Sequence, residues 1–185
     1  MALRAADEQV AAVSAADLSR PTPCAGWRLA DLLSHMIGQH HGFEQAVRHG
    51  AAPVQAYAPV AFTLAGWRAS AGALTAAFAG ADLAQPVVAA ELSAAAIPVS
   101  RVIDAQLLDT VVHTWDVASA LGGGYTPAGP LLDVTAQLAL TIPARARGPG
   151  GAFGPARPTS GRGPWADTLA ITGRGPGTEP MPPEE

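Results

Sequence analysis

The chain has 185 residues, which is enough for one domain with a sizeable core and short for two. Hydrophobic residues make up 49% of it, which excludes an intrinsically disordered chain. The formal net charge of −4 argues against a general nucleic-acid-binding surface, and the single cysteine, Cys24, excludes an internal disulfide and a multi-cysteine zinc site.

Residues 3–18 are rich in alanine, contain few helix breakers and predict a first helix. Acidic residues in this segment interrupt the apolar run that a signal peptide needs. No stretch approaches the roughly 18 consecutive apolar residues of a membrane helix. We therefore expect a cytoplasmic protein without a membrane partner.

Residues 19–27 contain two prolines and a glycine and predict a loop. A second helix is expected over residues 28–49, because apolar residues recur there at the 3–4 spacing of one helical face. These residues are Leu29, Leu33, Met36, Phe43 and Val47. Gly50 and Pro53 are expected to end this helix.

A third helix is predicted over residues 60–79, followed by an extended connection over 80–98. Ser100 is a suitable N-cap for a fourth helix that ends at Leu121, before three glycines. A fifth helical segment is expected over 128–142, an irregular stretch over 147–164 and a short terminal helix over 164–173. This pattern predicts an all-α fold, a helix bundle.

The fourth helix carries an unusual set of polar residues on an otherwise apolar sequence. Asp109, His113 and Asp116 share one side with Gln106, while residues 102–120 contain no Lys, Arg or Glu. A solvated helix face normally carries those long charged side chains. The composition therefore favours a buried helix whose polar side faces an interior or a pocket, where carboxylates need a partner, a proton or a metal.

Asp109 and His113 are four residues apart, so their side chains can converge on one point. A carboxylate and an imidazole suit Zn²⁺ or a similar divalent ion, and a catalytic site needs a third protein ligand. The second helix offers four histidines: His35, His40, His41 and His49. Helical periodicity does not choose among them, since it places His40 within the apolar stripe and His35 only at its edge.

Two motifs together resemble one known group of proteins. Pro23, Cys24 and Trp27 are followed by Leu32 and His35, and a later helix carries Asp109, His113, Trp115, Asp116 and Ala118. This pairing resembles the DinB-like superfamily, and within it the actinobacterial branch related to mycothiol-dependent maleylpyruvate isomerase. The late "LAITGRGP" segment also resembles the ending of such proteins, so the likeness spans at least residues 19–176.

The resemblance implies a DinB-like four-helix bundle with irregular connections and a short C-terminal helix, formed by one domain over residues 1–174. It also implies a divalent metal, usually zinc with nickel as the alternative, held by His35, Asp109 and His113. Asp116 would then orient His113 or cap a neighbouring backbone group. Residues 175–185 are expected to form a flexible tail.

The function expected from the resemblance is a metal-dependent transferase or isomerase that uses a thiol such as mycothiol on a small activated alkene or electrophile. A group must hold the developing enolate, and His40, His41 and Arg174 are candidates, although an exposed tail arginine is the favoured interpretation of Arg174. One alternative keeps the metal without the thiol, as a hydrolase or Lewis-acid enzyme. Another is a non-catalytic, metal-stabilised bundle that binds a small ligand.

Other features have plainer interpretations. Cys24 is expected to be a small packed residue, because no partner base is identified for its thiol. Arginines 145, 147, 157 and 162 form a locally basic segment, for which a solvated loop is favoured over an anion-binding site. The protein is expected to act on a small molecule as a monomer or a homodimer.

Overall fold

The structure, a computed structural model, describes residues 1–148 and 151–175. Its helices are α1 (Ala2–Val10), α2 (Leu29–His49), α3 (Leu64–Ala79), α4 (Val99–Ala120), α5 (Pro130–Leu140) and α6 (Pro164–Ile171). Short 3₁₀ turns connect them: η1 (Ala15–Ser19), η2 (Val54–Tyr57) and η3 (Ala144–Ala146). The strands are β1 (Ala51–Ala52), β2 (Pro86–Ala89) and β3 (Ile97–Pro98). None of these helices is both long enough and apolar enough to cross a membrane.

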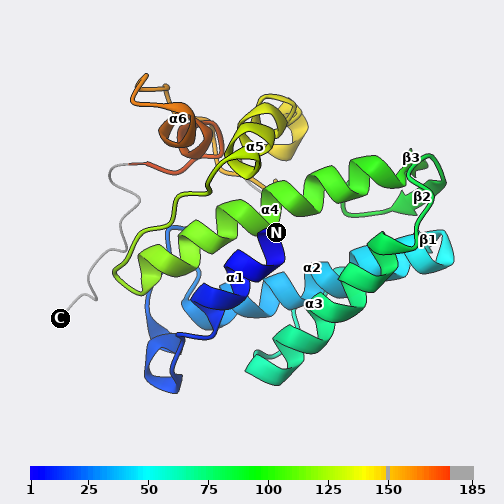
Figure 1. Cartoon of the computed structure of the whole chain (residues 1–185), viewed down its shortest axis with the longest axis horizontal. Coiled ribbons are helices and arrows are strands. Elements are labelled where there is room, and N and C mark those ends of the chain that lie inside the picture. The colour runs from blue at the N-terminus through cyan, green and yellow to red at the C-terminus, as the bar shows by residue number, and fades with distance from the viewer. Residues whose placement is uncertain (149–150, 176–185) are drawn as a thin grey trace.

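Helix α4 lies at the centre of the molecule. Helices α1 and α2 pack on one side of it, with α3 beyond α2, and α5 and α6 lie on the other side (Figure 1). Val117 packs among buried residues of α1 and α2, whereas Leu108 and Val112 pack against Ala139 of α5. This burial on both sides explains the absence of Lys and Glu from the middle of α4, and the burial predicted for this helix is confirmed.

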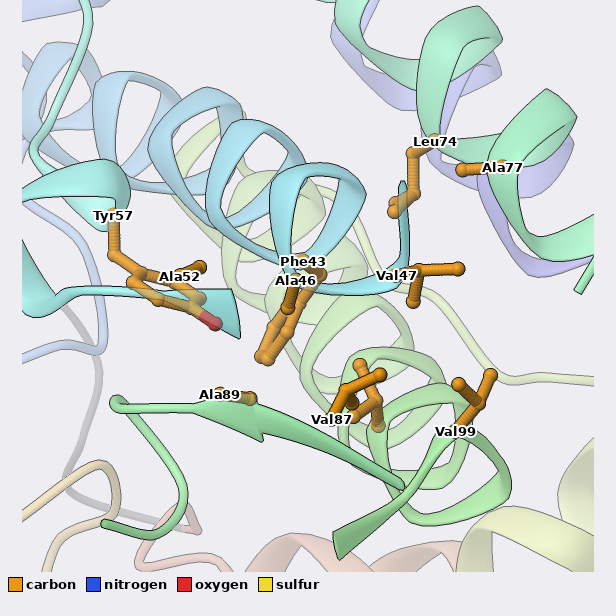
Figure 2. Close-up of a cluster of buried hydrophobic side chains, with 11 residues drawn as sticks. Phe43, Ala46, Val47, Ala52, Tyr57, Leu74, Ala77, Val87, Ala89 and Val99 are labelled. Carbon is orange, nitrogen blue, oxygen red and sulfur yellow. The ribbon is translucent and has the colours of Figure 1, made fainter. Parts of the chain in front are cut away.

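The mostly helical architecture is confirmed, but the purely all-α expectation misses a small sheet. Strand β1 pairs with β2 in parallel, with Ala51 opposite Val88, and β2 pairs antiparallel with β3. The sheet covers one end of the bundle, where Val87 and Ala89 pack with Phe43 of α2 and other buried residues (Figure 2). Strands of two to four residues leave too short a pattern to be distinguished from a loop in the sequence.

Several helix boundaries in the structure differ from the predicted ones, each for a local reason. The first predicted helix ends at Val10, because the Ser14 amide and hydroxyl both bond Asp17 and start the separate turn η1. The third begins at Leu64, where the Thr63 hydroxyl accepts the Gly66 amide.

Helix α4 begins at Val99 and Ser100 is not its cap. The amides of Val99 and Ser100 instead donate to the carbonyls of Gln85 and Leu83, which satisfies two of the first-turn donors without a side chain. The segment between α3 and β2 therefore fixes where α4 starts. Apart from Gly175, the tail expected over 175–185 lies outside the described residues.

Helix α2 approaches the η2 segment closely through a glycine. A Cβ atom added at Gly38 would lie 2.6 Å from the carbonyl oxygens of Tyr57 and Ala58. Gly38→Ala is therefore expected to lower the free energy of unfolding by about 1–3 kcal/mol, because backbone atoms would have to move. Chemical denaturation measures this change. The control is Gly72→Ala in α3, where no atom lies within 4 Å and the stability should stay level or rise.

Candidate metal centre

Helices α2 and α4 bring one histidine and an aspartate–histidine pair together. His35 comes from α2, and Asp109 and His113 come from successive turns of α4. The Oδ1 atom of Asp109 lies 3.3 Å from Nε2 of His113 and 3.9 Å from Nε2 of His35. All three residues can place a ligand atom within 4.8 Å of the others, a spacing that one metal ion can bridge.

His113 is oriented by a second carboxylate on the same helix. Its Nδ1 atom lies 2.8 Å from Oδ2 of Asp116, which is completely buried. Donation from Nδ1 to this carboxylate leaves Nε2 directed at Asp109. Asp116 therefore sets which imidazole nitrogen faces the three-residue group.

The group places one carboxylate beside two imidazoles, and each shifts the pKa of its neighbours. Burial by itself raises the pKa of Asp109, but the neighbouring imidazoles of His113 and His35 bring that pKa below its usual value. Burial lowers the pKa of His113, and the two carboxylates raise it well above its usual value. In addition, Oδ2 of Asp109 is a buried atom without a hydrogen-bond partner among the described residues. The electrostatics of the group therefore favour a bound cation, whether a proton or a metal.

Arg174 neutralises the buried Asp116. Its Nε and Nη2 atoms donate to Oδ1 and Oδ2 of this carboxylate at 3.2 and 2.7 Å. Burial raises the pKa of Asp116, but Arg174 and His113 outweigh burial and hold that pKa at about 2. A two-point pair of this kind fixes both the position and the charge of the carboxylate.

The C-terminal end of α6 places Arg174. Gly173 adopts a left-handed φ of 87°, and the amides of Gly173 and Arg174 return to the carbonyls of Ala170 and Leu169. This pair of bonds is the Schellman helix stop. It turns the chain so that the guanidinium enters the core, where Arg174 is only 6% exposed.

The loop before α2 adds a thiol and an aromatic ring. The Thr22 amide and hydroxyl both donate to the carbonyl of Trp27, and Gly26 has a φ of 79°, so the loop is a tight turn. The Cys24 sulfur lies 3.3 Å from Oδ2 of Asp116 and 3.4 Å from Nη2 of Arg174.

Trp27 lies over the histidines. Its ring centroid is 4.9 Å from that of His35 and 6.5 Å from that of His113. The loop thus supplies an apolar cover for two of the three donor groups.

A second group of donor atoms shares His113 with the first. Cys24, His113 and Asp116 also lie within 4.8 Å of one another and could hold a metal ion. The Arg174 guanidinium, however, contacts both the sulfur and the carboxylate of this group. A fixed positive charge at that position opposes a second cation there.

Residues 1–118 match the family described as the mycothiol maleylpyruvate isomerase N-terminal domain. The chain belongs to this family. Two uncharacterized proteins of Mycobacterium tuberculosis, from strains CDC 1551 / Oshkosh and ATCC 25618 / H37Rv, are each 33% identical to it over 164 residues. The alignment covers 87% of this chain and 86% of each relative. No solved structure shows a significant match.

Membership of the mycothiol maleylpyruvate isomerase N-terminal domain family confirms the resemblance derived from the two motifs. It suggests a mycothiol-related, metal-associated function with a thiol or another small molecule as partner. The family match includes His35, Asp109, His113 and Asp116 and ends before Arg174. The counter-charge of Asp116 therefore comes from a part of the chain that the family match does not cover.

The structure brings together the three residues predicted as metal ligands. The predicted exposure of Arg174 is wrong, because the Schellman stop directs its side chain inward. The plain packing role expected for Cys24 is incomplete, because its thiol contacts Asp116 and Arg174. No motif spacing could have revealed these two contacts, which join residues 92 and 150 positions apart.

The two other catalytic candidates lie apart from this group. His41 is exposed on α2, and no contact in the described part of the chain joins it to the metal-ligand candidates. His40 is fully buried and its Nδ1 lies 2.9 Å from the hydroxyl of Ser70, which itself donates to the Trp67 carbonyl. Since the hydroxyl proton is used there, Nδ1 of His40 is the donor to Ser70.

His40 is expected to make folding sensitive to acid. Burial lowers its pKa from 6.5 to about 4. Below about pH 6.5 the unfolded chain binds a proton at His40 and the folded chain does not. The free energy of unfolding therefore falls as the pH is lowered from about 6.5 to about 4. Between about pH 7 and about pH 5 the loss should approach about 2 kcal/mol.

Urea denaturation at the two pH values checks this prediction. His40→Gln should remove most of the loss, whereas His49→Gln, at an exposed position of the same helix, should keep it. An equal loss in wild type and His40→Gln would contradict the assignment to His40.

Proposed function

We propose that the chain is a divalent-metal-dependent enzyme in which His35, Asp109 and His113 bind the ion, with Zn²⁺ as the first candidate and Ni²⁺ as the second. The observation that carries this proposal is the direct approach of Nε2 of His113 to Oδ1 of Asp109. With Nδ1 donating to Asp116, the neutral form of the imidazole would present the lone pair of Nε2 to the carboxylate oxygen. Two such acceptors repel each other unless a cation lies between them.

The distances support a metal as that cation. Two atoms that each lie about 2.1 Å from one tetrahedral zinc ion are roughly 3.4 Å apart. The separations of 3.3 and 3.9 Å from Asp109 to His113 and His35 lie around this value. The buried Oδ2 of Asp109, which has no hydrogen-bond partner in the described part of the chain, is a further acceptor on the same carboxylate.

The other donor group is less suitable for a metal. Binding at Cys24 and Asp116 would break the hydrogen bonds of Arg174 to both residues and leave a buried guanidinium beside the ion. Asp116 fits better as the residue that orients His113, as carboxylates commonly do for metal-binding histidines.

We infer that the substrate is a small thiol, with mycothiol as the leading candidate, which adds to an activated alkene. A bound Zn²⁺ with an open position lowers the pKa of a thiol or a water molecule and so supplies a nucleophile at neutral pH. In a transferase the new sulfur–carbon bond is kept and the thiol proton ends on the adjacent carbon. In an isomerase the same bond breaks again after rotation, and the thiol is released.

The protein groups around the centre have separate tasks in this proposal. Asp116 holds the proton on Nδ1 of His113, and Arg174 keeps Asp116 ionised. Trp27 covers His35 and His113 and limits the access of water to them. These contacts pre-organise the donor atoms before any ligand binds.

Metal content of tag-free protein tests the first part of the proposal. Wild type and the control His49→Ala, at the exposed end of the same helix, should each retain about one metal ion per chain, whereas His113→Ala should lose it. A folded wild type that contains no metal and takes up no added zinc or nickel would overturn the metal centre.

Thiol binding tests the second part. Calorimetric titration with mycothiol should give saturable binding to the metal-loaded protein and none to the chelator-treated protein. A loaded protein that ignores thiols but hydrolyses activated esters would instead support the metal-dependent hydrolase.

A further inference from the structure

A second feature of the structure borders Arg174 and the loop before α6. A cavity of about 390 Å³ is lined by arginines 157, 162 and 174, by Ser160, and by Pro158, Ala166, Ala170 and Gly175. This volume lies within the range of small-molecule sites. The basic segment of the sequence is an exposed loop over residues 154–162, as predicted, and two of its arginines also line this concave site.

The charge of this lining has one sign. Three guanidinium groups and no carboxylate are found among the described residues that line the cavity. Guanidinium groups present planar pairs of donors that match carboxylate and phosphate oxygens. The apolar Pro158, Ala166 and Ala170 offer contact for the carbon atoms of a ligand.

Arg174 forms an interior wall of the cavity and still has a donor to offer. Its contacts with described residues use Nε, both Nη2 protons and one Nη1 proton, which donates to the Thr172 carbonyl. An arginine has five N–H groups, so one Nη1 proton remains. Arg174 is 6% exposed and lines the cavity, so this proton is a donor that a ligand there could use.

The outer wall is held in place by backbone contacts. Oδ1 of Asp167 accepts the amides of Ser160 and Gly161, and the Arg157 amide donates to the Ala170 carbonyl. The Ser160 hydroxyl accepts from Nε of Arg162, so its own proton is available to donate. The loop is thus fixed against α6 with its polar groups already arranged.

We propose that this cavity is a binding site for a small organic anion, held through a carboxylate or phosphate group by Arg162 and Arg174. None of the three proposed metal ligands is among the described residues that line this cavity. Its occupancy does not require the proposed metal.

Isothermal titration calorimetry of the full chain tests the proposal, with succinate and glycerol 3-phosphate as probes at constant ionic strength. Either probe should show saturable binding with one molecule per chain, and the tighter of the two assigns the carboxylate or the phosphate class. Uncharged glycerol should show none. Affinity should fall by about tenfold or more in Arg162→Gln, because a hydrogen bond to a charged group is lost.

The matched control is Arg145→Gln, which removes an arginine of the same basic segment that does not line the cavity. It should bind both probes as wild type does. The proposal would be overturned if neither probe bound saturably, or if both variants lost the same fraction of the affinity. Chelator-treated protein should bind the probe unchanged, and loss of binding there would place the anion on the metal and also overturn the cavity site.

Discussion

Replacement of Asp116 by asparagine is expected to lower the free energy of unfolding by about 3–5 kcal/mol, because it leaves the buried Arg174 without its counter-charge. Asparagine has nearly the same shape, so the loss measures charge and not packing. Asp116 also accepts from Nδ1 of His113, and the variant loses the charge-assisted part of that bond. Urea denaturation of metal-free protein provides the measurement.

An ion pair at the surface supplies the control for Asp116. Glu44 and Arg48 form a pair on α2 with partly exposed side chains, and Glu44→Gln should cost less than about 1 kcal/mol. A loss in Asp116→Asn as small as that of Glu44→Gln would mean that Arg174 finds solvent or another partner. The double variant Asp116→Asn/Arg174→Gln should recover part of the loss, since no buried charge then remains unpaired.

Zinc is expected to stabilise the metal-stripped protein by about 4 kcal/mol when its free concentration is a thousand times the dissociation constant. The gain follows from the proposed centre, because an ion that binds the folded chain alone shifts the folding equilibrium by mass action. Asp109→Asn should remove most of this gain, since it takes away the only carboxylate among the three proposed ligands. Thermal and urea denaturation with and without zinc measure the difference.

The control for Asp109 lies on the same helix. Asp104 is half exposed and close to Arg101, and Asp104→Asn should keep the full gain from zinc. Equal gains in wild type and Asp109→Asn would show that zinc binds elsewhere on the chain.

The part of the site that lies within one helix could be predicted from the sequence. Asp109 and His113 are one turn apart, so the helix alone brings their side chains together, and the missing Lys and Glu residues signal that this helix is buried. His35 could not be chosen in this way. The choice among four histidines of α2 depends on how α2 is rotated about its axis against α4, and the packing of the core sets that rotation. The family resemblance is what selects His35.

The remaining part depends on contacts between distant segments. Arg174 and Asp116 are 58 residues apart, and nothing in the sequence near either residue indicates the other. The sequence predicts that the last helix ends at residue 173, but where the next side chain points also depends on the docking of α6 on α5 and α4. The small sheet was missed for a related reason, since its strands are defined by their partners more than by their own residues.

The Arg174–Asp116 pair also has a consequence for the order in which parts of the chain become fixed during synthesis. Every proposed ligand of the metal has been made once the ribosome has passed residue 113, yet the partner of Asp116 follows 58 residues after that carboxylate. Until then, the emerging chain carries a carboxylate beside His113 that has no guanidinium to balance it. The nascent protein should therefore hold its donor groups loosely and reach its final rigidity only when α6 docks, which makes the last described helix the step that completes assembly.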